Sequence, residues 1–143
     1  MRRASSSTAA AAVSGLTAGR PLAATLGDPA GIGPEILAKA WRALGADGPR
    51  FFVIGDARAL SAWAPVRTID GPSDVGADFA DALHVLDLPL AEAPTPGEPT
   101  SEAAPRIVNW IETAVRLALS GQAAGVVTAP IAKTSLYAGG FKH

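Results

Sequence analysis

Residues 22–35 read Leu22-Ala-Ala-Thr-Leu-Gly-Asp-Pro-Ala-Gly-Ile-Gly-Pro-Glu35, an apolar run followed by a glycine-rich turn and a helix start. The apolar run 22–26, bounded by a proline and a glycine, predicts a buried strand. Pro34 suits the first turn of a helix, and Glu35 favours that end through the helix dipole. We therefore expect a strand, a turn and a helix that ends at Gly45.

The same alternation of strand and helix continues along the chain. Further strands are expected at 50–54, 66–69, 83–88 and 123–128, and further helices from Asp56 to about Trp63, Glu102 to about Leu119 and Ile131 to about Tyr137. Asp56 and Ser101 are the expected N-caps, and the proline-rich stretch 91–100 is an expected loop. Nearly continuous apolar strands that alternate with helices indicate a parallel α/β sheet with both faces covered.

Several large side chains are assigned to the core by helical spacing. The long helix has an expected apolar face of Ile107, Trp110, Ile111, Ala114, Val115 and Leu117. The tryptophans Trp41, Trp63 and Trp110 all fall on apolar helix faces, so all three are expected in the core. His84 lies in a strand pattern and is expected to be a packed or edge histidine.

Composition excludes several classes of protein. The chain has 143 residues, a net charge of −1, no cysteine and two histidines. The length suits one domain, and the balanced charge argues against a nucleic-acid partner. No stretch reaches the roughly 20 apolar residues of a membrane span. Without cysteine there is no disulfide or thiol nucleophile, and two histidines cannot build a multi-histidine metal site within this chain.

The two ends of the chain differ from its middle. Residues 1–20 are rich in Ala, Ser and Thr, with three arginines and no acidic residue. We expect a disordered low-complexity extension there, with a targeting peptide as the alternative. Residues 21–143 are expected to be the ordered part. Because Tyr137–His143 carries no closing signal, we expect a truncated N-terminal portion of a longer α/β fold.

Two turns carry the candidate chemistry. The turn Gly27–Gly33 follows a strand, where α/β proteins bind ligands, and its glycines and helix start suit an anion. An equally good interpretation is a tight turn that needs positive φ. The stretch is neither a Walker loop nor a Rossmann fingerprint, because Pro34 follows Gly33 and Ile36 stands where a third glycine is needed.

The second turn joins Thr128 and Lys133 after another buried strand. Thr128 can donate a hydrogen bond, and Lys133 can pair with a phosphate or carboxylate. The simpler interpretation is a solvated lysine and a threonine bonded to its own turn. Asp56 also follows a strand, but helix capping explains it fully.

These segments together resemble the 4-hydroxythreonine-4-phosphate dehydrogenase family. The string from Leu22 to Glu35 is similar to the family's opening, and Phe52-Val-Ile-Gly-Asp56 to its second strand and turn. Val127-Thr-Ala-Pro-Ile-Ala-Lys133 resembles its Thr-Ala/Gly-Pro-x-x-Lys segment, and Gly139-Gly-Phe-Lys-His143 the approach to its Gly-His-Thr-Glu-Phe motif. The resemblance implies a three-layer α/β/α fold like that of the isocitrate and isopropylmalate dehydrogenases, of which this chain holds the N-terminal part.

The resemblance also implies a reaction. The family oxidises 4-(phosphooxy)-L-threonine with NAD or NADP, and the product loses CO2 to give 3-amino-2-oxopropyl phosphate in pyridoxal 5'-phosphate biosynthesis. A divalent metal (zinc, magnesium or cobalt) assists, and the full-length enzyme is a cytoplasmic homodimer. The expected partner is thus a small phosphorylated hydroxy-amino acid, with no nucleic acid and no membrane.

The family's main site residues would follow His143, so no catalytic residue and no metal ligand is assigned in this chain. The expected cleft-lining residues are Asp28, Gly31, Gly33, Thr128 and Lys133. The chain alone is expected to be inactive, and its open strand edges to cause poor solubility or dimerisation. Two alternatives stay open: a paralogous dehydrogenase of D-threonate or D-erythronate 4-phosphate, and a non-catalytic α/β module.

Overall fold

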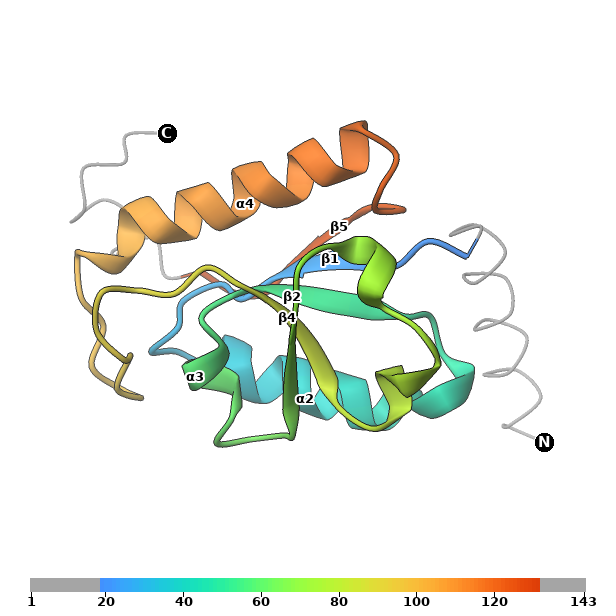
Figure 1. Cartoon of the computed structure of the whole chain (residues 1–143). Coiled ribbons are helices and arrows are strands. Elements are labelled where there is room, and N and C mark those ends of the chain that lie inside the picture. The colour runs from blue at the N-terminus through green and yellow to red at the C-terminus, as the bar shows by residue number, and fades with distance from the viewer. Residues whose placement is uncertain (1–18, 132–143) are drawn as a thin grey trace.

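A parallel sheet between two layers of helices forms the protein (Figure 1). The computed structural model describes residues 19–131. Its strands are β1 (Leu22–Thr25), β2 (Phe51–Gly55), β3 (Val66–Ile69), β4 (Leu83–Asp87) and β5 (Val126–Thr128). Its helices are α2 (Gly33–Leu44), α3 (Ala57–Leu60) and α4 (Ala103–Leu119), with short 3-10 turns η1 (Gly45–Asp47), η2 (Pro72–Asp74) and η3 (Ala77–Ala80). The expected α/β fold is confirmed.

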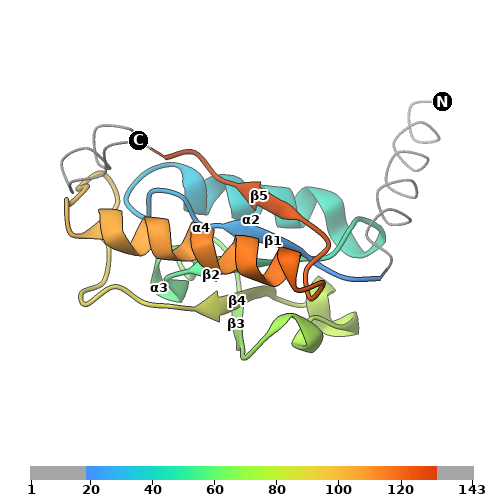
Figure 2. The ribbon, with the colours of Figure 1, turned by 90° about the horizontal axis from the view of Figure 1, so that it is seen from above.

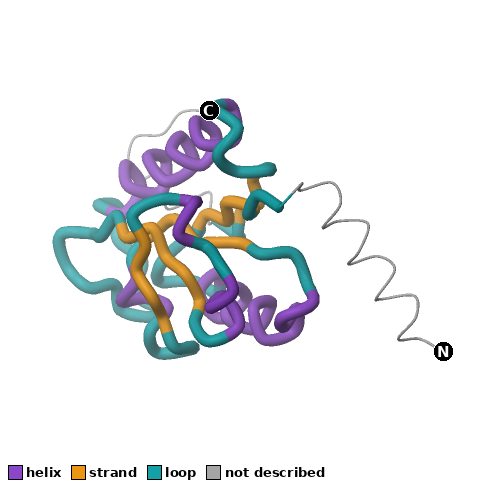
Figure 3. The backbone as a smooth tube through the Cα atoms, turned by 45° about the vertical axis from the view of Figure 1, so that its right-hand side comes forward, coloured by secondary structure: helices purple, strands orange, loops and turns teal. Residues whose placement is uncertain are grey.

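The strand order β3-β4-β2-β1-β5 shows how the chain is wound. All pairings are parallel, with β1 between β2 and β5. The chain moves outward from β1 to β2, and after β4 it returns through α4 to β5 on the other side of β1. Helices α2 and α3 cover one face of the sheet and α4 covers the other (Figures 1 and 2), which gives the three layers seen in Figure 3. The carboxyl ends of β1 and β5 therefore flank a point where the winding reverses, a common ligand position in such sheets.

The core lies on both faces of the central strands. Every residue of β2 is buried, as expected for a strand covered on both sides. Trp110 of α4 is fully buried and its indole N–H donates to the carbonyl of Leu88 at 2.9 Å. Trp41 of α2 similarly donates to the carbonyl of Phe79 at 2.8 Å. These bonds satisfy the one polar group of each indole, and they fix α4 to the residue that follows β4 and α2 to the turn that precedes β4.

His84 is a packed histidine, as expected. The ring is fully buried in β4. Its Nδ1 lies 3.0 Å from the carbonyl oxygen of Ala82, and its Nε2 lies 3.2 Å from a carboxylate oxygen of Asp78. Asp78 also pairs with Arg67 of β3. The group belongs to the amino end of the sheet, away from the turns that carry the candidate chemistry.

The expected helix from Asp56 to Trp63 is shorter, and Trp63 is not in the core. Helix α3 ends at Leu60, because the N–H groups of Trp63 and Ala64 both bond to the Leu60 carbonyl and tighten the chain into a turn. The turn leads directly to Pro65, and the Trp63 side chain is 39% exposed. The predicted core position of Trp63 is wrong, because the helix that would bury it ends at Leu60.

Two further boundaries differ from the expectations. The strand expected at 123–128 is ordered as a strand only from Val126. Ser101 is not the N-cap of α4: that position is Glu102, and no side chain caps the helix. The carbonyls of Thr100 and Ser101 accept the first N–H groups instead, so a backbone turn replaces the expected hydroxyl cap. Within residues 19–131, no helix has the length and apolarity needed to cross a bilayer.

Candidate functional site

The turn after β1 packs against the turn after β5. Gly27 has φ of 73°, and a Cβ built there would lie 2.5 Å from the carbonyl oxygen of Pro130. The Asp28 N–H donates to that same carbonyl at 3.2 Å. Glycine is needed at position 27 both for the left-handed conformation and for the close approach of the two turns.

Gly33 is required by a second close approach. Its Cβ would lie 2.3 Å from the carbonyl oxygen of Leu26, too close for any side chain. Gly31 differs, because it is exposed and has no positive φ. The tight-turn interpretation thus accounts for Gly27 and Gly33 by contacts inside the protein, and it leaves Gly31 as the exposed glycine of the motif.

Asp28 shapes this turn from within. It is 6% exposed, and its carboxylate accepts a hydrogen bond from the Ala30 N–H at 3.0 Å. Thr25, the last residue of β1, is also buried, and within the described chain its hydroxyl has no hydrogen-bond partner. Thr128 is the register neighbour of Thr25 and is exposed. Two hydroxyl residues therefore stand side by side where β1 and β5 end, an arrangement that the sequence analysis did not identify.

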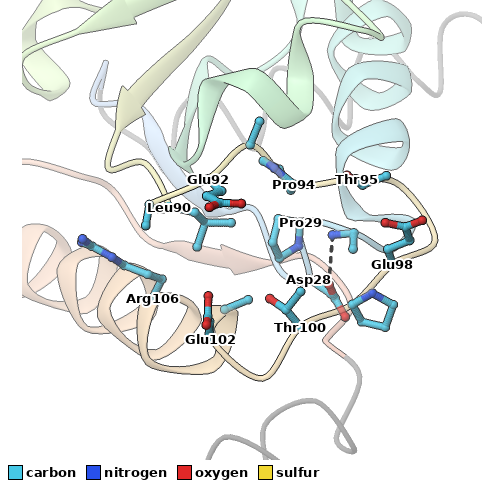
Figure 4. A pocket seen from close by; sticks show the side chains of 15 residues that line it. Asp28, Pro29, Leu90, Glu92, Pro94, Thr95, Glu98, Thr100, Glu102 and Arg106 are labelled. Carbon is cyan, nitrogen blue, oxygen red and sulfur yellow. Dashed lines mark hydrogen bonds between the residues drawn. The ribbon is translucent and has the colours of Figure 1, made fainter.

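A cavity of about 380 Å³ opens beside the turn (Figure 4). It is bounded by the turn after β1, the loop that follows β4 and the first turns of α4. Its lining residues are Asp28, Pro29, Ala30, Leu90, Ala91, Glu92, Ala93, Pro94, Thr95, Glu98, Pro99, Thr100, Glu102, Ala103 and Arg106. Of the five expected cleft residues, Asp28 lines this cavity. Gly31, Gly33 and Thr128 do not, and Lys133 lies outside the described residues.

The cavity lining is acidic. Glu92, Glu98 and Glu102 join Asp28 there, and Arg106 is the one cationic side chain of the lining. Such a lining disfavours an anion and favours a neutral or positively charged group. No sequence pattern predicts these glutamates, because loop 91–100 has no periodicity and Glu102 stands at the start of a helix. The only available signal was that the loop follows a strand of the sheet.

Asp56 connects the start of the loop that follows β4 to the sheet through hydrogen bonds. Its buried carboxylate accepts hydrogen bonds from the Arg58 N–H at 2.9 Å and from the Arg58 guanidinium at 2.8 and 3.1 Å. It also accepts from the Leu90 N–H at 2.9 Å, and Arg58 donates to the Leu90 carbonyl at 2.8 Å. Asp56 is the expected N-cap of α3, but the structure gives it a second role, because Leu90 lines the cavity.

The charge of Asp56 should therefore contribute to stability in a pH-dependent way. Burial alone raises the pKa of this carboxyl, but the hydrogen bonds from Arg58 and Leu90 outweigh it and hold the pKa below its ordinary value. A lowered pKa means that the stabilisation is complete above about pH 4, the unfolded pKa, and is lost as the pH falls through the folded pKa. We expect Asp56→Asn to cost roughly 1–3 kcal/mol of unfolding free energy at neutral pH.

Urea unfolding of both proteins across the acidic range measures this effect. The difference between wild type and Asp56→Asn should shrink as the pH falls below about 4. The exposed Asp47, changed to Asn, serves as the control and should show a small difference throughout. A wild-type advantage that stays constant down to low pH would contradict the assigned role of the carboxylate.

The described residues do not fit a divalent metal. Between residues 19 and 131, no three His, Asp or Glu side chains are grouped so that they could hold one. Nor do Gly27 and Gly33 form an open cradle for a dinucleotide, because both face the protein's own backbone. The second histidine, His143, lies outside the described residues.

These features define a class of protein: a doubly wound parallel α/β protein whose candidate site lies among the loops after β1, β4 and β5. The sequence model of the pyridoxal phosphate biosynthetic protein PdxA family matches residues 47–143. The chain belongs to this family.

Three known proteins show the extent of the similarity. A 4-hydroxythreonine-4-phosphate dehydrogenase of Caulobacter vibrioides is 53% identical over 126 residues, which cover 86% of this chain and 38% of the relative. The crystal structure of the Klebsiella pneumoniae enzyme of that name is 33% identical with a TM-score of 0.73, covering 87% of this chain and 41% of that one. A terephthalate 1,2-cis-dihydrodiol dehydrogenase of Burkholderia xenovorans is 27% identical with a TM-score of 0.67, covering 87% and 38%. The chain thus spans about two-fifths of the length of these relatives.

Proposed function

We propose that this chain supplies the N-terminal portion of a dehydrogenase that oxidises 4-(phosphooxy)-L-threonine. The observation that carries the proposal is the 53% identity with a relative of that name, maintained over 86% of the chain. The position of the candidate site supports it, because the turns after β1, β4 and β5 form one edge of the sheet, where parallel α/β proteins hold their ligands.

The reaction proposed for the complete enzyme is an alcohol oxidation followed by a decarboxylation. The secondary alcohol gives up a hydride to NAD+ or NADP+ and a proton to a base, and becomes a ketone. The ketone lies β to the carboxylate, so the C–C bond to the carboxylate breaks, CO2 leaves, and protonation of the remaining carbon gives 3-amino-2-oxopropyl phosphate. The role of this chain is to form one wall of the cleft through the turn at Asp28 and the loop after β4.

We assign the metal ligands, the phosphate site and the cofactor site to other parts of the enzyme. Any ligands of a divalent metal lie outside residues 19–131, since the described residues offer no suitable group. The acidic cavity also offers no phosphate site, because glutamates outnumber its one arginine. We place the substrate phosphate and the nicotinamide cofactor outside this cavity, in a cytoplasmic homodimer that is completed by further sequence.

A second substrate class stays in the proposal for a specific reason. One solved neighbour with a TM-score of 0.67 is named for a dihydrodiol substrate. The fold therefore serves more than one hydroxylated substrate. The alternative for this chain is a dehydrogenase of D-threonate or D-erythronate 4-phosphate.

A hybrid chain tests the proposal. It joins the present 143 residues to the unmatched part of the Caulobacter vibrioides relative. With a divalent metal and NAD+ or NADP+, we expect the hybrid to oxidise 4-(phosphooxy)-L-threonine with a kcat/KM at least about tenfold above those for D-threonate and D-erythronate 4-phosphate. Faster oxidation of either sugar-acid phosphate would transfer the proposal to the alternative.

The 143-residue chain alone should show no turnover in the same assay. The physical reason is that the described residues contain neither a metal-binding group nor a dinucleotide cradle. Reduced cofactor formed by the isolated chain, dependent on substrate and metal, would contradict this account of where the catalytic groups lie. A folded chain, verified by circular dichroism, is the necessary control.

A further inference from the structure

The loop that follows β4 is held at its start by an ion pair. The Asp56 side chain is fully buried and lies 2.8 Å from the Arg58 guanidinium, whose side chain is 46% exposed. The carboxylate accepts a hydrogen bond from the Leu90 N–H at 2.9 Å, and the guanidinium donates one to the Leu90 carbonyl at 2.8 Å. One pair of side chains therefore binds both polar groups of the Leu90 backbone. We call Asp56, Arg58 and Leu90 the Leu90 clamp.

Helix α3 holds Arg58 in place for this contact. The Ala57 N–H donates to the Asp87 carboxylate at 2.9 Å, and the Arg58 N–H donates to the Asp56 carboxylate at 2.9 Å. The helix therefore begins on two carboxylates at the carboxyl ends of β2 and β4. Because a guanidinium is a planar fork with several N–H donors, Arg58 can bind Asp56 and Leu90 at the same time.

The tip of the same loop is a β-turn that bonds to the turn after β1. The Glu98 N–H donates to the Thr95 carbonyl at 3.0 Å, and Gly97 has φ of 79°. Proline at position 96 and a glycine with positive φ at position 97 are typical of a type II turn. The Gly97 N–H is not used within such a turn, and it donates to the Ala30 carbonyl at 2.8 Å. A hydrogen bond therefore joins two walls of the cavity.

Between the clamp and this turn, little else fixes the path of the loop. The backbone of residues 91–94 makes no hydrogen bond to the described part of the chain, residues 19–131. The loop runs along the cavity from Leu90 to Glu98 and contributes Glu92 and Glu98 to its lining (Figure 4). The position of this wall therefore depends on two fixed points, the clamp at Leu90 and the hydrogen bond from Gly97 to Ala30.

We propose that Arg58 is a positioning residue of the candidate site. Arg58 does not line the cavity. It acts through Leu90, whose backbone it fixes so that the loop reaches Ala30 and places Glu92 and Glu98 in the cavity wall. The inference rests on the proposed function in one respect, because it takes this loop as a wall of the substrate cleft.

Hydrogen exchange with residue resolution in the 143-residue chain separates positioning of the loop from stabilisation of the whole fold. In Arg58→Gln, the Gly97 amide should exchange at least about tenfold faster than in the wild type, because the loop no longer leaves the sheet at a fixed point. The Ala23 amide, bonded to Gly125 within the sheet, reports global unfolding and should change much less.

A matched arginine provides the control. Arg50 is exposed and directly precedes β2, at the opposite end of that strand from Arg58. Arg50→Gln should change the exchange of neither Gly97 nor Ala23. Unchanged exchange of Gly97 in Arg58→Gln would overturn the proposal, and so would acceleration of Gly97 and Ala23 by the same factor.

Arg58→Lys covers the case in which Arg58→Gln does not fold. It retains a positive charge beside the buried carboxylate of Asp56, but an ammonium lacks the forked geometry that also reaches Leu90. The Gly97 amide should again exchange faster than in the wild type, by a smaller factor than in Arg58→Gln. Wild-type exchange of Gly97 in a folded Arg58→Lys chain would overturn the proposal.

Steady-state kinetics of the hybrid chain connect the position of the loop to the substrate. Arg58→Gln should raise the KM for 4-(phosphooxy)-L-threonine at least about fivefold and leave kcat within about twofold, since a displaced wall weakens binding without removing a reacting group. The KM for the cofactor should not change, because we place the cofactor outside this cavity. A fall in kcat with unchanged KM would overturn the positioning role. An inactive wild-type hybrid would instead contradict the proposed function, and the exchange of Gly97 would still decide the role of Arg58.

Discussion

Gly33→Ala is expected to destabilise the chain by at least about 3 kcal/mol, a loss that unfolds many small domains. The new methyl group would lie 2.3 Å from the carbonyl oxygen of Leu26, which belongs to backbone hydrogen-bonded into the sheet and cannot move freely. Either the start of α2 or the end of β1 would have to shift to relieve this steric clash. Urea unfolding followed by circular dichroism measures the loss directly.

A matched glycine separates this steric effect from a general effect of substitution. Gly71 has extended backbone and nothing within 4 Å of a built Cβ. Gly71→Ala should change the free energy of unfolding by no more than about 0.5 kcal/mol. If Gly33→Ala were equally neutral, the motif's second close approach would not exist, and an open ligand cradle would again become a reasonable interpretation of Gly33.

Trp110→Ala is expected to cost roughly 3–5 kcal/mol of unfolding free energy. The side chain is fully buried between α4 and the sheet, and its indole N–H holds the Leu88 carbonyl at 2.9 Å. Among the described residues, the variant removes the largest fully buried side chain, and it leaves that carbonyl without its partner. Loss of packing and loss of the hydrogen bond therefore act in the same direction.

Two further variants show how much of the Trp110→Ala destabilisation comes from packing in the core and how much from the hydrogen bond. Trp110→Phe retains much of the buried ring and removes the hydrogen bond, so its cost should lie well below that of Trp110→Ala. Trp63→Ala should cost much less than Trp110→Ala, because Trp63 is 39% exposed. Equal losses at Trp63 and Trp110 in thermal or urea unfolding would contradict the assignment of the core.

The order of strands and helices could be predicted from local signals. The apolar run at residues 22–26, the capping residue Asp56 and the stop at Gly45 each act within a few residues of the structure they determine. A parallel sheet also followed, because consistently apolar strands must be covered on both faces. Boundaries were less predictable where a turn competes with a helix, as after Leu60.

The candidate site was less predictable because its parts meet across the chain. Leu90 is held by Asp56, which lies 34 residues away, and no local pattern contains that bond. The glutamates of the cavity lie on a loop or at a helix start without periodicity. The glycine motif was identified correctly as a turn, but only the distances to Leu26 and Pro130 show that two of its glycines serve internal contacts.

The function of the complete enzyme is the central claim, and one rate tests it most directly. The initial rate of cofactor reduction by the hybrid chain, with 4-(phosphooxy)-L-threonine as substrate, is compared with that of the intact Caulobacter vibrioides relative. We expect a rate within about tenfold, because the matched stretches are 53% identical over 126 residues and should form the same wall of the cleft. A hybrid that folds cooperatively and reduces no cofactor would contradict the claim.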